Sequence, residues 1–213
     1  MRNVFLSNDP ASVGRVRENC EEVTLAGLAL VEERQLASCR VVHPGSAKAF
    51  KDISLEILEN PKLSVFDPSR IGIYKNGVLA GEVWRNFHAD PFKLIAHSNG
   101  KRYLLCGSDY QGFTVVDLDG EVATHYLPKE AFFGRGWCMA QILSYEKQTN
   151  RIKLVGCHWA DRYEIRTYDF SVPEAMPWPL FEQRYECDSP LGNRKLQGSL
   201  PFTGIRHVQR LRT

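Results

Sequence analysis

The sequence has 213 residues, of which 43% are hydrophobic and 24% are charged, and its formal net charge is +2. This composition is typical of a globular protein and excludes a disordered or collagen-like chain. The longest apolar run, Leu25 to Val31, is far shorter than the roughly 20 residues that a helix needs to cross a bilayer. The first eleven residues lack the continuous apolar core of a secretory peptide. We therefore expect a soluble, cytoplasmic protein that does not enter a membrane.

Six cysteines are spread through the chain, and no two of them form a C-x-x-C pair. The usual sequence signature of zinc binding or dithiol chemistry is therefore missing. Cytosolic thiols stay reduced, and four of the six have apolar or aromatic neighbours, where a thiol behaves as a small core residue. We expect reduced, structural cysteines and no cofactor.

Residues 1–62 are predicted to form a small mixed α/β part. Asp9 and Pro10 predict a helix over Ala11 to Cys20, because aspartate caps helix N-termini and proline fits the first helical position. Residues 21–36 fit either a continuation of this helix or a strand, because helix-favouring and β-branched residues are mixed in them. Both alternatives stay open.

A second short helix is predicted over Ser46 to Leu58. From residue 63 to residue 187 the pattern changes to short strands and turns, which predicts a β-rich core. Its clearest local feature is Asn76-Gly77, the preferred pair for a two-residue turn in which both residues have positive φ. Because residues with β propensity flank this pair, the sequence predicts a hairpin over Arg70 to Trp84.

Two stretches of the predicted core have the same order of strand and turn residues, fifty positions apart. Leu104-Leu105-Cys106 aligns with Leu154-Val155-Gly156, and residues 113–119 align with residues 163–169. In each copy an apolar strand is followed by a polar and aromatic connector and then by an alternating strand that ends on aspartate. A period near fifty is typical of propeller blades, which are meanders of about four strands.

With these units the chain resembles the blade repeats of β-propeller proteins from residue 71 to residue 180. The resemblance implies a mainly β fold of antiparallel meander sheets, arranged as propeller blades or as an open or sandwiched sheet. It implies no specific function, because the Gly-His and Trp-Asp marks of the WD repeat are absent. The chain is short for a closed ring, so a homo-oligomer that completes the ring is a further alternative. We expect a single domain over residues 1–213.

No strong catalytic signature occurs in the sequence. Phosphate-binding, dinucleotide-binding, nucleophile-elbow and zinc-protease motifs are all missing. The chain is therefore predicted to be a binding or interaction module rather than an enzyme, with a peptide or a small molecule as its ligand. Connectors of repeated units emerge on one face and carry function. The residues predicted to bind the ligand lie in three connectors and combine aromatic, imidazole, amide and charged groups: Trp84, His88, Asp90, Asp109, Tyr110, Gln111, His158, Trp159, Asp161 and Arg162.

Two alternative functions stay open. The first is a metal-assisted hydrolase, because imidazole and carboxylate groups are normal ligands of zinc and manganese. Its ligands would be His88, Asp90, His158 and Asp161. The second is a nucleic-acid-associated protein, because residues 188–213 carry five basic residues and one acidic residue. Cys157 is not expected to act as a nucleophile with His158, since neighbours on a strand point to opposite faces.

Overall fold

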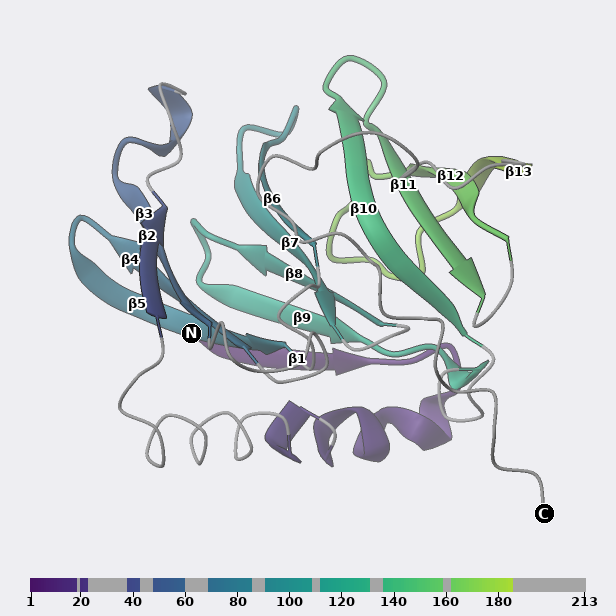
Figure 1. Cartoon of the computed structure of the whole chain (residues 1–213), viewed down its shortest axis with the longest axis horizontal. Helices are drawn as coiled ribbons and strands as arrows, with labels where there is room; N and C mark the ends of the chain where they lie inside the picture. Colours follow the sequence, from purple (N-terminus) through teal and green to yellow (C-terminus); the bar gives the residue numbers. More distant parts are fainter. Residues whose placement is uncertain are drawn as a thin grey trace.

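The computed structural model describes residues 1–18, 20–22, 38–42, 48–59, 69–85, 91–108, 112–130, 136–158 and 162–185. The fold is mainly β, as the sequence predicts: within these residues, thirteen strands form three largely antiparallel sheets. Figure 1 shows the three sheets side by side. None of the described helical segments is long and apolar enough to cross a bilayer.

Each sheet is built on a meander of four consecutive strands. The N-terminal sheet contains β2 (Ser38–Val42), β3 (Ile53–Glu59), β4 (Ser69–Lys75) and β5 (Val78–Arg85). The central sheet contains β6 (Phe92–Ala96), β7 (Arg102–Ser108), β8 (Gly112–Asp117) and β9 (Val122–Tyr126), and β1 (Arg2–Leu6) is added parallel to β9. The C-terminal sheet contains β10 (Trp137–Glu146), β11 (Arg151–His158), β12 (Glu164–Asp169) and β13 (Leu180–Tyr185). The boundary predicted near residue 62 falls inside the N-terminal sheet.

The segments that align in the sequence occupy corresponding strands of two meanders. Residues 104–106 lie on β7 and residues 154–156 lie on β11, each the second strand of its sheet. The following aligned segments supply the third strands, β8 and β12. The N-terminal sheet has the same plan, and β3, β7 and β11 start at Ile53, Arg102 and Arg151, 49 residues apart each time. The repeat and the propeller-type arrangement both stay predictions.

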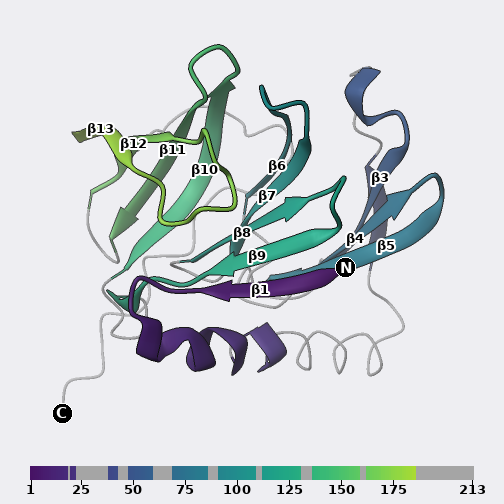
Figure 2. The same cartoon turned by 180° about the vertical axis from the view of Figure 1, so that it is seen from behind.

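Two local predictions are confirmed. Asn76 and Gly77, with φ values of 52° and 78°, form the two-residue turn between β4 and β5. At the N-terminus, Asp9 accepts a hydrogen bond from the Ala11 amide and caps the turn η1 (Pro10–Ser12). Helical residues 13–18 and 20–22 follow. The helix runs alongside β1 (Figure 1, Figure 2).

The helix predicted over Ser46 to Leu58 is wrong. Among the described residues of this span, only the short turn η2 (Lys48–Phe50) is helical, and β3 begins at Ile53. Ile53, Leu55 and Ile57 alternate with polar residues and are all buried, which is the pattern of a strand with one face in the core. Of residues 21–36, for which helix and strand stayed open, residues 21 and 22 are helical, and residues 23–36 lie outside the described residues, as does the basic segment 188–213.

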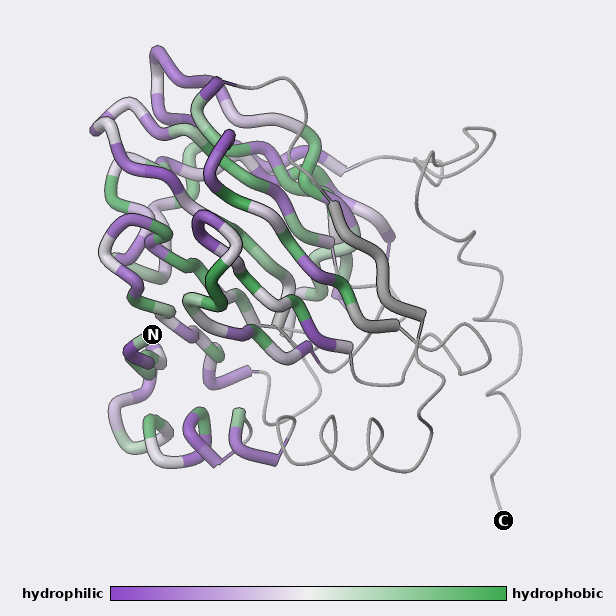
Figure 3. The backbone as a smooth tube through the Cα atoms, turned by 90° about the vertical axis from the view of Figure 1, so that its left-hand side faces the viewer, coloured by the Kyte–Doolittle hydropathy of each residue, from purple (hydrophilic) through white to green (hydrophobic). Residues whose placement is uncertain are grey.

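The central sheet is buried on both faces. One hydrophobic cluster joins it to the N-terminal sheet, and a second cluster joins it to the C-terminal sheet. Every residue of β8 is buried, because Phe113 and Val115 enter the second cluster while Val116 enters the first. Figure 3 shows hydrophobic residues concentrated along the strands. The central sheet therefore positions the two outer sheets.

Arg102 links the N-terminal and central sheets at the start of β7. Its guanidinium binds the carboxylates of Asp52, before β3, and Asp119, after β8. Its Nη1 also donates to the carbonyl oxygen of Ala49 at 3.0 Å. The hydrogen bonds from Arg102 hold the pKa values of both carboxyl groups below their usual range. One partly buried guanidinium thus connects two sheets.

We expect Arg102→Lys to lower the free energy of unfolding by about 2 kcal/mol, because an ammonium group cannot bind two carboxylates in the forked geometry of a guanidinium. Urea unfolding at pH 7 measures this change. Arg184→Lys is the matched control: Arg184 is 72% exposed beside Glu182, and exposed pairs contribute less than about 1 kcal/mol. Equal effects of the two substitutions would contradict the role of Arg102.

His125 attaches β1 to the rest of the central sheet. Its Nε2 lies 3.1 Å from Oδ1 of Asn3, its Nδ1 lies 3.0 Å from Oγ1 of Thr114, and its ring stacks on Phe5. Burial lowers the pKa of the His125 imidazole to about 4. The imidazole is therefore neutral in the folded protein at pH 7.

This pKa predicts acid sensitivity. Between pH 6.5, the ordinary pKa of histidine, and pH 4, the unfolded chain binds a proton at His125 more readily than the folded chain. The free energy of unfolding should therefore fall as the pH is lowered through this window. Urea unfolding at pH 7 and pH 5 should show a smaller difference for His125→Gln than for the wild type, and equal differences would contradict this role of His125.

Candidate functional site

Three of the ten residues predicted to bind a ligand lie in the described part of the chain. Trp84 is half-buried near the end of β5, where it pairs with Arg70 of β4. His158 ends β11 and Arg162 precedes β12, and both are exposed. The other seven lie outside the described residues: His88, Asp90, Asp109, Tyr110, Gln111, Trp159 and Asp161.

The three predicted connectors do not follow equivalent strands of their meanders. Residues 109–111 and 159–161 each follow the second strand of a meander, whereas Trp84 lies on the fourth strand of its sheet. The central sheet also lies between the N-terminal sheet, which contains Trp84, and the C-terminal sheet, which contains His158 (Figure 1).

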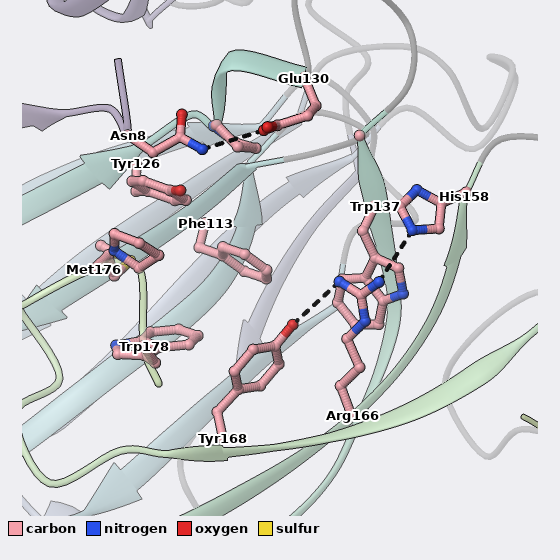
Figure 4. A pocket seen from close by; sticks show the side chains of 13 residues that line it. Asn8, Phe113, Tyr126, Glu130, Trp137, His158, Arg166, Tyr168, Met176 and Trp178 are labelled. Atoms are coloured by element: carbon pink, nitrogen blue, oxygen red, sulfur yellow. Dashed lines mark hydrogen bonds between the residues drawn. The ribbon is translucent and has the colours of Figure 1, made fainter. Parts of the chain in front are cut away.

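A pocket of about 220 Å³ lies between the central and C-terminal sheets, and we call it the aromatic pocket (Figure 4). Five aromatic residues from both sheets and from the β12–β13 connection line it: Phe113, Tyr126, Trp137, Tyr168 and Trp178. Polar groups are contributed by Asn8, Glu130, His158 and Arg166. Of the residues predicted to bind a ligand, His158 alone is among the lining residues in the described part of the chain.

The aromatic walls hold one another in place. Phe113 lies at the centre, with its ring centroid 5.2 Å from that of Trp178 and 6.3 Å from that of Trp137. Tyr168 meets Trp178 edge to face at 6.0 Å. These separations are those of favourable aromatic pairs. Nε1 of Trp178 donates to the carbonyl oxygen of Pro173 at 2.9 Å, which fixes the indole within its own loop.

The two sheets are also hydrogen-bonded at the opposite ends of their strands. Nε2 of the buried His97 donates to the carbonyl oxygen of Phe170 at 2.8 Å. The Tyr145 hydroxyl accepts a bond from the Ser98 amide at 3.2 Å and donates to Oδ1 of Asn150 at 2.8 Å. The sheets are therefore joined directly at one end and separated by the aromatic pocket at the other.

Arg166 forms the polar wall of the aromatic pocket. Its ζ carbon lies 4.7 Å from the centroid of the Trp137 ring, within the range of a cation–π contact. It forms an ion pair with the buried carboxylate of Glu164, whose other oxygen accepts a hydrogen bond from Gln183. The positive charge of Arg166 is thus balanced inside the C-terminal sheet.

His158 is held by the same guanidinium. Its Nε2 lies 3.0 Å from Nη2 of Arg166, and because a guanidinium only donates, Nε2 is the acceptor. Within the described residues, no three His, Cys, Asp or Glu side chains are grouped as metal ligands. His158 therefore lends no support to the metal-assisted hydrolase, and the other three predicted ligands of that site lie outside the described residues.

Most residues that line the aromatic pocket were not predicted from the sequence. Its aromatic residues lie on strands or beside them, where a single ring is indistinguishable from an ordinary core residue. A pocket forms only because two sheets bring these rings face to face, and this packing has no local sequence signal. The chain matches no protein-family model, no curated protein and no solved structure. The geometry of the aromatic pocket is therefore the basis on which a function is proposed below.

Trp137 depends on Gly156, which lies beside it on β11. A Cβ atom at position 156 would lie 2.5 Å from Cζ2 of Trp137 and 2.0 Å from the carbonyl oxygen of Cys138. Both separations are far shorter than van der Waals contact. Gly156 therefore lets β10 approach β11 and lets the indole lie against the strand.

We expect Gly156→Ala to lower the free energy of unfolding by about 3 kcal/mol, at the upper end of overpacking effects, because backbone atoms must move. The measurement is urea unfolding, with tryptophan fluorescence reporting displacement of Trp137. Gly14→Ala serves as the control, since a Cβ there meets nothing within 4 Å and the residue is helical. That change should raise stability by up to about 1 kcal/mol. A stable Gly156→Ala protein with unchanged fluorescence would show that the close approach is not required.

Proposed function

We propose that this chain is a binding module, and that the aromatic pocket binds one aromatic or apolar side chain of a peptide partner. The observation that carries the proposal is the size of the pocket together with its aromatic walls. Its volume of about 220 Å³ is below the roughly 300–1,000 Å³ of sites for drug-sized ligands. It exceeds the roughly 150 Å³ of an engineered apolar cavity that binds benzene. The volume of the aromatic pocket therefore suits a single ring.

The walls of the aromatic pocket suit such a side chain. Full burial of an aromatic or large aliphatic side chain contributes about 1.5–3 kcal/mol. The rings are already in mutual contact, so little order has to be gained on binding. Nη1 of Arg166 and the Tyr168 hydroxyl are 3.5 Å apart, which is a weak hydrogen bond. A hydroxyl or carbonyl oxygen of the bound group can accept the hydrogen bond from Arg166 in place of the Tyr168 hydroxyl, and the loss of the weak Arg166–Tyr168 bond costs little free energy.

The polar groups of the aromatic pocket favour binding over catalysis. The described lining residues include no serine, threonine, cysteine, lysine or aspartate. Oε2 of Glu130 accepts a hydrogen bond from Asn8 at 3.2 Å, and Arg166 holds His158. These groups lack the paired nucleophile and base that covalent catalysis requires. The proposal includes a cytoplasmic location, in which reduced thiols such as those of Cys20, Cys106, Cys138 and Cys157 are stable.

The test uses p-cresol, the side-chain analogue of tyrosine, titrated into the protein and followed by NMR. We expect saturable shifts of the indole N–H signals of Trp137 and Trp178, because both rings line the aromatic pocket. The signal of Trp84, which lies on the N-terminal sheet, should not move. Its indole therefore provides a reference within the same sample.

Phe113→Trp should weaken p-cresol binding by about tenfold, because a larger ring at the centre of the aromatic pocket occupies part of its volume. Phe92→Trp makes the same chemical change on β6, outside the aromatic pocket, and should leave the affinity unchanged. Absence of saturable shifts in the wild type, or equal affinity in the wild type and Phe113→Trp, would refute the proposed site.

A further inference from the structure

Cys138 and Cys157 are direct cross-strand partners on β10 and β11. Their neighbours Trp137 and Met139 point into the core between the sheets. Because side chains alternate along a strand, both cysteines point to the outer face of the C-terminal sheet. Both are partly exposed and reduced. Two thiols therefore lie side by side where small molecules from solvent can reach them.

The strands are close together at this pair. In an antiparallel sheet, the Cβ atoms of opposite residues are about 4.5–5.5 Å apart, whereas a disulfide needs about 3.5–4.5 Å. Gly156 directly precedes Cys157 and has no side chain. The two strands therefore approach so closely that the carbonyl oxygen of Cys138 lies 2.0 Å from the position that a Cβ atom of residue 156 would occupy. A small inward movement is enough to join the two sulfur atoms.

Tyr163 gives independent support for this placement. Burial, together with smaller contributions from Cys157 and Cys138, raises the pKa of the Tyr163 hydroxyl to about 12. Two thiols that act on one phenol lie near the same point of the outer face.

We propose that Cys138 and Cys157 are a redox modification site that a low-molecular-weight disulfide, such as glutathione disulfide, converts to an intramolecular disulfide. The thiolate of one cysteine attacks a sulfur atom of glutathione disulfide, forms a mixed disulfide and releases one glutathione thiolate, which takes up a proton. The second cysteine loses its proton and attacks the sulfur of the first, releasing the second glutathione. The protein loses two protons and two electrons, and glutathione disulfide becomes two glutathione molecules.

The bond is expected to be readily reversible. Drawing opposite strands together strains the disulfide, and strained, accessible disulfides are easily reduced. Trp137 and His158 are the adjacent cross-strand pair and both line the aromatic pocket. The bond would therefore fix the two strands at one wall of that pocket. The redox site does not depend on the proposed function, because its chemistry involves the outer face of the sheet.

The experiment is to incubate the full-length protein with glutathione disulfide, block remaining thiols and measure the intact and tryptic masses. We expect the loss of two hydrogen atoms and a covalent link between the tryptic peptides 136–147 and 154–162, each of which contains one cysteine. Reduction with dithiothreitol should remove the link. This mapping uses the wild-type protein, so it does not depend on the folding of a variant.

Variants then assign the chemistry to the pair. Cys138→Ser should prevent the link and leave Cys157 as a stable mixed disulfide with glutathione, and Cys157→Ser should do the reverse. Cys20→Ser replaces a cysteine of similar exposure and should leave the link unchanged. Stable glutathione adducts on wild-type Cys138 or Cys157, or a link of either residue to another cysteine, would overturn the proposal.

Discussion

Burial of the central sheet on both faces is the constraint on which the rest of the structure depends. Polar groups at the edges of this sheet must form hydrogen bonds or ion pairs within the protein, because little water reaches them. Asp117, only 4% exposed, binds Lys101 at 2.7 Å and accepts bonds from the amides of Asp119 and Gly120. The partly buried guanidinium of Arg102 likewise binds two carboxylates, those of Asp52 and Asp119, between the N-terminal and central sheets. The hydrogen-bonded ends of β7 and β8 thus fix the positions of the outer layers.

The aromatic pocket follows from how the C-terminal sheet meets this central layer. Direct hydrogen bonds from His97 and Ser98 hold one end of the two sheets together. At the other end the facing residues are large rings, and the aromatic pocket lies between them. Arg166 can stand at its wall because the buried Glu164 balances its charge. Side chains of β12 therefore contact both neighbouring strands beside the pocket: Arg166 binds His158 of β11, and Glu164 binds Gln183 of β13.

Features set by neighbouring residues were predictable from the sequence, and features set by packing were not. Asn76-Gly77 and Asp9-Pro10 each determine their own backbone, so the hairpin and the helix start could be predicted. The prediction of a helix over residues 46–58 was wrong because the alternation of buried isoleucine and leucine on β3 outweighs helix propensity. The candidate site was mostly missed because Phe113 and Trp178 meet only across two sheets.

The parallel pairing of β1 with β9 has a consequence for how the chain is made. Arg2 pairs with Val122 and Leu6 pairs with Tyr126, so β1 has no partner until β9, 120 residues later in the chain, has been synthesised. Contacts of such high sequence separation form slowly. Until β9 is available, the apolar segment Val4 to Leu6 is therefore unpaired and accessible to chaperones and to neighbouring chains.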